Sequence, residues 1–204
     1  MKKILLIITL IILIFPLVNL KVQAAEGTYA SIFPDEELAS AVAQEITGSS
    51  DITQTVTQAE LDTVTKLSIK DRLDLSSIVG IQNLTKLVDL EIANANLTDI
   101  SPISTLASLE RLSMPDNKII DLTPVKGLTK LSYINFNSNE IVDVSAIDSL
   151  SISVLNVYLN DNHIYNIGNV GEAGTYNAAN QTITLPSVEV TNNQLSEENI
   201  YSSY

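Results

Sequence analysis

A repeat with a period of 22 residues fills the middle of the chain. Three successive rows, residues 84–105, 106–127 and 128–149, align without gaps, and apolar residues fall at positions 1, 4, 7, 9, 14, 17 and 20. Imperfect rows flank these three: one has an extra residue before Leu75, and the other has an extra residue after Leu150. Self-similarity at a fixed period of this length is typical of a solenoid, in which stacked coils bury their apolar sides together.

The spacing within a row predicts the shape of each coil. Positions 7 and 9 lie two apart, so both point inward from a short strand. Positions 14, 17 and 20 step by three, as in a 3₁₀ or extended return. We therefore expect a leucine-rich repeat: an α/β solenoid of about five coils over residues 61–172, with a parallel β-sheet on its concave face.

An asparagine column at position 12 is the predicted structural ladder. An inward amide at this turn can bond backbone groups that the turn leaves unpaired. Ala95 interrupts the column, so we expect the turn of row 84–105 to be less well bonded than the others. The members of the column are Asn117, Asn139 and Asn162.

Positions 6, 8 and 10 point away from the core and form the concave surface. Tyr133 and Tyr158 fall one strand apart, with Arg111 on the strand before them, and exposed Tyr and Arg are enriched among interface hot spots. We predict a partner-binding face centred on these three residues. A solvated face without a binding role is the alternative. The full candidate set is Lys66, Asp89, Glu91, Arg111, Tyr133, Asn135, Tyr158 and Asn160.

A helical N-terminal cap is predicted over residues 25–60. Pro34 suits the first position of a helix that ends at Gly48, and the acidic residues after Pro34 suit the positive end of its dipole. Thr57 and Glu60 form a capping box that opens a second, short helix. The acidic residues do not follow the spacing of a metal-binding loop, so a structural cap is favoured over a metal site.

The segment from residue 173 to residue 204 has a different pattern. It contains an alternating, β-rich stretch that Pro186 interrupts, which is typical of an edge strand. A complete all-β module needs about seven such strands. Either this strand pairs with the final coil, or it begins a truncated module.

The first 24 residues have the three parts of a signal peptide: Lys2 and Lys3, an apolar run, and small residues before a predicted cleavage site after Ala24. An uncleaved membrane anchor is the alternative. Cleavage removes three lysines and no acid, which leaves eight basic and 24 acidic residues and a formal charge of −16. This charge argues against binding to nucleic acid or to anionic membranes. With no cysteine, the exported chain has no disulfide framework.

No catalytic residue, metal ligand or cofactor site is predicted. His163 is the only histidine and falls in a turn, and the absence of cysteine excludes Cys–His nucleophiles. The glycines of residues 168–174 match no nucleotide-binding motif. A carboxylate pair for glycoside hydrolysis remains open among 24 acids, but nothing in the sequence selects one.

The chain resembles the internalins, the leucine-rich-repeat surface and secreted proteins of Gram-positive bacteria. "IFPDEELASAVAQEI" and "VTQAELDTVTKL" are similar to the internalin cap. The rows with Asn at position 12, with "DISPI" and "DLTPV", are similar to the internalin repeat. "NQTITLPSVEV" is similar to the opening strand of the immunoglobulin-like module that follows the repeats in that family.

This resemblance implies a protein-binding module used in adhesion or host interaction, with aromatic side chains on its concave face. The immunoglobulin-like module is only begun, and no LPXTG sorting signal follows it. We therefore expect a secreted monomer that binds a host receptor or another cell-surface protein and has no stable membrane insertion after cleavage. A truncated, non-functional or purely structural remnant of a larger wall-anchored protein is the alternative.

Overall fold

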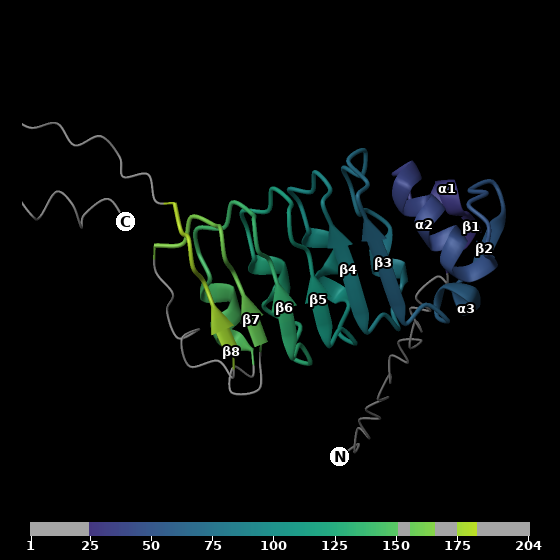
Figure 1. Cartoon of the computed structure of the whole chain (residues 1–204). Coiled ribbons are helices and arrows are strands. Elements are labelled where there is room, and N and C mark those ends of the chain that lie inside the picture. Colours follow the sequence, from purple (N-terminus) through teal and green to yellow (C-terminus); the bar gives the residue numbers. More distant parts are fainter. Residues whose placement is uncertain (1–24, 151–155, 166–174, 183–204) are drawn as a thin grey trace, which may run out of the picture.

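The computed structural model describes residues 25–150, 156–165 and 175–182, and these form a cap followed by a solenoid (Figure 1). The predicted signal peptide and the segment from residue 183 onward lie outside the described residues. Six parallel strands follow one another in sequence order along the solenoid. They are β3 (Lys66–Lys70), β4 (Asp89–Ala93), β5 (Arg111–Ser113), β6 (Tyr133–Asn135), β7 (Asn156–Tyr158) and β8 (Thr175–Asn177).

The register of the sheet follows the sequence rows. Lys66, Asp89, Arg111, Tyr133 and Asn156 pair in succession, so position 6 forms one line across five strands. Positions 7 and 9 point into the core. The ten side chains at these two positions in the five coils are each at most 3% exposed. These are Leu67, Ile69, Leu90, Ile92, Leu112, Met114, Ile134, Phe136, Val157 and Leu159.

After every strand of the solenoid, one residue in the left-handed backbone conformation turns the chain. At position 11 of each coil the backbone φ lies between 52° and 58°, a conformation that Asn and Asp tolerate better than most residues. The turn therefore depends on short polar side chains rather than on glycine. The six residues are Asp71, Asn94, Asp116, Ser138, Asp161 and Asn180.

Short 3₁₀ helices return the chain on the side opposite the sheet. They are η1 (Ile81–Asn83), η2 (Ser101–Thr105), η3 (Thr123–Val125) and η4 (Ser145–Ser149). The aspartate at position 16 lies two residues before three of these helices: Asp99, Asp121 and Asp143 each accept a bond of 2.7–2.8 Å from the backbone N–H of the first helical residue. This bond gives the aspartate column of the repeat a physical role, because it satisfies a donor that the first helical turn leaves unpaired.

The cap is built from two short antiparallel strands and three helices. These are β1 (Glu26–Thr28), α1 (Tyr29–Ile32), α2 (Glu36–Thr47), β2 (Thr55–Thr57) and α3 (Gln58–Leu61). The capping box of Thr57 and Glu60 is present at the start of α3, and Gly48 ends α2 with a φ of 73°. The prediction for Pro34 was wrong: α2 begins at Glu36, and Asp35 is its N-cap, because the carboxylate accepts from the backbone N–H groups of Glu37 and Leu38.

The cap docks on the first coil through polar side chains and one close backbone approach. The second oxygen of Asp35 accepts bonds from the backbone N–H groups of Ser76 and Ser77 at 3.0 and 3.1 Å. Gly80 has a φ of 102°, and a Cβ there would overlap the carbonyl oxygen of Ile32. Only glycine therefore fits at this contact.

The solenoid continues beyond its predicted end. The repeats were expected to end before residue 173, and the segment after it was expected either to pair with the final coil or to begin a truncated module. Within this segment β8 pairs in parallel with β7. Val157 pairs with Tyr176, an offset of 19 residues instead of the 22 of the regular rows. Because this coil is shorter, its columns do not align with the repeat, and the sequence pattern did not reveal it.

Candidate functional site on the concave face

The three asparagines of position 12 are buried and hold neighbouring coils together. The Oδ1 atom of Asn139 accepts from the N–H of Ile119 in the previous coil at 3.0 Å. Its Nδ2 atom donates to the carbonyl oxygens of Met114, Phe136 and Asn137 at 2.9–3.1 Å. Asn117 and Asn162 repeat this pattern one coil before and one coil after. The ladder is thus structural, and its amides face the core.

Sequence reasoning missed the last rung of this ladder. In the final described coil, the Oε1 atom of Gln181 accepts from the N–H of Ile164 at 2.9 Å, and its Nε2 atom donates to the carbonyl oxygens of Leu159 and Ala179. At the other end Ala95 supplies no amide. The N–H of Leu75, which an asparagine would bond, donates to the carbonyl oxygen of Arg72 at 2.9 Å instead.

Charged residues form a network across the first three strands of the concave face. Lys66 Nζ lies 3.3 Å from Asp89 Oδ2, and Arg111 Nε lies 3.6 Å from Asp89 Oδ1. Lys70 and Ser68 both contact Glu91, each at 2.9 Å. Partial burial raises the pKa of Glu91, but the bonds from Lys70 and Ser68 and the charges of Lys70 and Arg111 outweigh it and lower this pKa.

The network continues into an aromatic pair. The guanidinium carbon of Arg111 lies 3.6 Å from the centre of the Tyr133 ring, and the rings of Tyr133 and Tyr158 have centroids 5.4 Å apart with planes tilted by 39°. Such cation–π and aromatic contacts favour defined side-chain orientations. The structure thus brings Lys66, Asp89, Arg111, Tyr133 and Tyr158 into one continuous row.

The two asparagines of the candidate set make backbone contacts. The Oδ1 atom of Asn135 accepts from the N–H of Asn137 at 3.0 Å, and that of Asn160 accepts from the N–H of Ala179 at 2.7 Å. Asn137, which was outside the set, bonds the N–H of Asn160 at 2.8 Å in the same way. These residues therefore brace the later coils while remaining partly accessible on the concave face.

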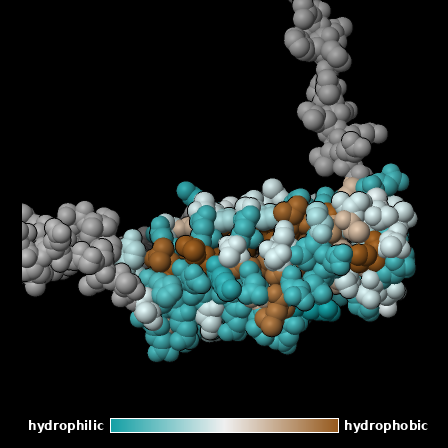
Figure 2. Space-filling model, turned by 90° about the horizontal axis from the view of Figure 1, so that it is seen from above, coloured by the Kyte–Doolittle hydropathy of each residue, from teal (hydrophilic) through white to brown (hydrophobic). Residues whose placement is uncertain are grey.

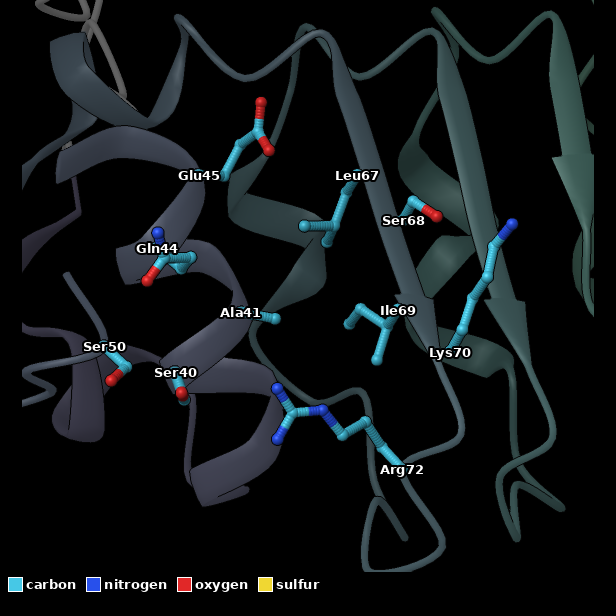
Figure 3. A pocket seen from close by; sticks show the side chains of 10 residues that line it. All are labelled: Ser40, Ala41, Gln44, Glu45, Ser50, Leu67, Ser68, Ile69, Lys70 and Arg72. Carbon is cyan, nitrogen blue, oxygen red and sulfur yellow. The ribbon is translucent and has the colours of Figure 1, made fainter. Parts of the chain in front are cut away.

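Two further surfaces were not predicted. A groove of about 430 Å³ lies between α2 and β3, and its lining includes Ser40, Gln44 and Glu45 of α2 and Ser68 and Lys70 of β3 (Figure 3). Along the turns that follow the strands, hydrophobic atoms form an interrupted row among hydrophilic ones (Figure 2). The exposed apolar side chains at position 15 of three successive coils are Ile120, Val142 and Tyr165.

The described residues offer little for metal or redox chemistry. Within them, no group of three or more His, Asp or Glu side chains could hold a metal ion. His163 is half-buried rather than fully exposed, and its Nδ1 atom lies 2.7 Å from the carbonyl oxygen of Thr182. A search of the same residues for a helix that is long and apolar enough to cross a membrane finds none.

The parallel sheet, the 3₁₀ returns and the asparagine ladder define a leucine-rich-repeat protein. Residues 24–62 match the family described as bacterial adhesion/invasion protein N terminal. A 67-residue stretch is 42% identical to Internalin H of Listeria monocytogenes and spans 33% of this chain and 12% of that protein.

Solved structures extend the likeness to the solenoid. An internalin (inlF) from Listeria monocytogenes matches with a TM-score of 0.69 and 29% identity, over 76% of this chain and 45% of that one. The functional domain of InlJ from the same organism, which includes a cysteine ladder, matches with a TM-score of 0.64 and 27% identity over 80% and 36%. The chain is a leucine-rich-repeat protein that is similar to internalins, and it spans less than half the length of these relatives.

Proposed function

We propose that the protein is an exported binding module that holds a protein partner against its concave face, in adhesion or host interaction. The single observation that carries this proposal is the row of Arg111, Tyr133 and Tyr158. The three side chains contact one another on the surface while none of them is buried. Large, pre-ordered aromatic and guanidinium groups provide contact area at low entropic cost, which is the property of interface hot spots.

The similarity of the cap to bacterial adhesion and invasion proteins supports the same role. A binding function also suits the described residues better than catalysis, because Arg111, Tyr133 and Tyr158 lie on an extended surface. The identity of the partner follows from a pull-down with the purified chain from host-cell or bacterial-envelope extracts.

Replacing Tyr133 and Tyr158 together by Ala tests the proposed face. We expect the affinity for the captured partner to weaken by about 2 kcal/mol or more, with an unchanged thermal unfolding midpoint, because neither ring is part of the core. Tyr165→Ala is the matched control, since this tyrosine is 50% exposed on the turn side. A double variant that binds and unfolds like the parent moves the site away from the concave face.

Export is part of this proposal and has its own measurement. We expect cleavage after Ala24, because small residues precede this bond and follow an apolar run with a basic start. N-terminal sequencing of the protein from culture supernatant should begin at Ala25. Recovery of the intact chain only from membranes would show that the apolar run acts as an anchor.

A further inference from the structure

The floor of the concave face contains a buried hydroxyl without a partner. Ser113 lies at position 8 of β5, on the concave side, and is only 3% exposed. Within the described part of the chain, its side chain makes no hydrogen bond, although nearly all buried polar groups of native proteins are bonded to protein or water. Its Oγ atom is therefore available to a water molecule or to a group that enters the concave face.

Two further donors lie next to Ser113. Arg111 is two residues earlier on the same face, and its guanidinium is positioned by Asp89 and by the Tyr133 ring, yet among the described residues it donates no hydrogen bond. Asn135 pairs with Ser113 in the sheet register. Its Oδ1 atom is occupied by the N–H of Asn137, and its Nδ2 atom has no acceptor within the described ranges.

The surroundings determine which charge an acceptor at this place can carry. Glu91, on the other side of Ser113, points its carboxylate to Lys70 and Ser68, so it does not fill the site. One guanidinium with two neutral donors suits a single negative charge, whereas the nearby carboxylates of Asp89 and Glu91 oppose a doubly charged anion. The concave positions carry three cations, Lys66, Lys70 and Arg111, against these two acids, although the whole chain has a formal charge of −13.

We propose that Arg111, Ser113 and Asn135 form a subsite for a carboxylate, namely an Asp or Glu side chain of the protein partner. The inference rests on the proposed binding function and names the chemistry of its contact point. The guanidinium receives the charge, and the hydroxyl and the amide donate to the carboxylate oxygens. The two tyrosines then cover the apolar surroundings of the bound side chain.

The subsite can be tested without the partner. The amide resonances of the full chain are followed by NMR during titration with N-acetyl-glutamate methylamide, with the matching glutamine compound, and with inorganic phosphate at constant ionic strength. We expect saturable shifts at Arg111, Ser113 and Asn135 with the glutamate compound, and at least about tenfold weaker binding of the other two. Equal binding of the glutamine compound, or tighter binding of phosphate, overturns the assignment.

Ser113→Ala separates a binding role from a structural one. It removes a buried hydroxyl that has no partner in the free protein, so the unfolding midpoint should stay the same or rise. The affinity for the glutamate compound should fall about tenfold. Arg111→Gln should abolish binding, and Lys118→Gln, outside the concave set, should leave it unchanged. A destabilised Ser113→Ala protein with unchanged binding would refute the subsite, whereas failure of the tyrosine variants alone would refute only the wider binding face.

Discussion

Asp35 in the cap and Asn139 in the coils both reach from one structural unit into the backbone of the next. The carboxylate of Asp35 accepts from backbone donors on two sides, in α2 and in the first coil, at a partly exposed joint. Asn139 is 6% exposed and meets one donor and three carbonyl acceptors. A carboxylate can only accept, whereas an amide both accepts and donates without a charge. The buried joint therefore uses the neutral group.

Replacing the buried amide of Asn139 by a carboxylate should have the largest effect on stability. Asn139→Asp keeps the size but points an oxygen at three carbonyl oxygens and buries a charge, so we expect a loss of about 3–5 kcal/mol in the free energy of unfolding at neutral pH. Asn139→Ala should cost about 1–3 kcal/mol. Urea unfolding measures both variants. A loss for Asn139→Asp that is no larger than the loss for Asn139→Ala would show that the rung tolerates charge.

Replacing the carboxylate of Asp35 in the cap by an amide should destabilise the protein less. Asp35→Asn presents an NH₂ group to the backbone donors of Ser76 or of Glu37, so we expect a loss of about 1–2 kcal/mol. Asp51→Asn is the control inside the cap, because among the described residues the Asp51 carboxylate bonds only Thr53 and Gln54 of its own loop, and it should cost less than Asp35→Asn. Equal losses in urea for the two variants would mean that Asp35 does not hold the cap to the first coil.

Lowering the pH should have the smallest of these effects, and it should destabilise the cap before the coils. Hydrogen bonds lower the pKa of three carboxylates in the cap and at its junction with the coils: from Thr53 for Asp51, from Thr57 for Glu60, and from Gln58 and Thr85 for Asp62. Since these folded-state pKa values lie below the unfolded ones, the stability they contribute is complete above about pH 4 and is lost as the pH falls through the lowered values.

The amide ladder of the coils does not titrate in this range, and Glu91 is the one coil carboxylate of the described residues whose pKa is shown to be lowered. In NMR spectra recorded from pH 7 to pH 2, cap resonances should therefore lose their dispersion before those of the coils. Replacing the three carboxylates by their amides should reduce this difference. Simultaneous loss in cap and coils would contradict the division between the two regions.

The comparison also shows what the sequence could predict. The 22-residue rows predicted the coils, the direction of positions 6 to 9 and the burial of Asn117, Asn139 and Asn162, because these depend on a spacing that recurs. Asp35 was assigned to the helix dipole, since its role depends on Ser76 and Ser77, about 40 residues away, in a contact that no local pattern encodes. The sequence likewise could not predict that the Ser113 hydroxyl makes no bond to a described residue, because this depends on which groups the neighbouring side chains bond.

The C-terminal coil shows a different limit. Gln181 makes the backbone bonds that an asparagine makes in the other coils, but its side chain is longer and its coil is shorter. Neither its residue type nor its spacing therefore matches the asparagine column. The β-rich composition of the same region left open whether it pairs with the final coil or begins a separate module. A repeat is recognised only while its units have equal length, whereas the backbone bonds of the ladder can also be made by a related amide at a different spacing.

The stacked tyrosines of the concave face also have an optical consequence. The chain has seven tyrosines and no tryptophan, so no indole absorbs or masks their emission. Tyr133 lies between the guanidinium of Arg111 and the ring of Tyr158. A partner that binds over this row changes the surroundings of both fluorescent rings. The unlabelled protein therefore carries its own fluorescent reporter at the surface where we place its partner.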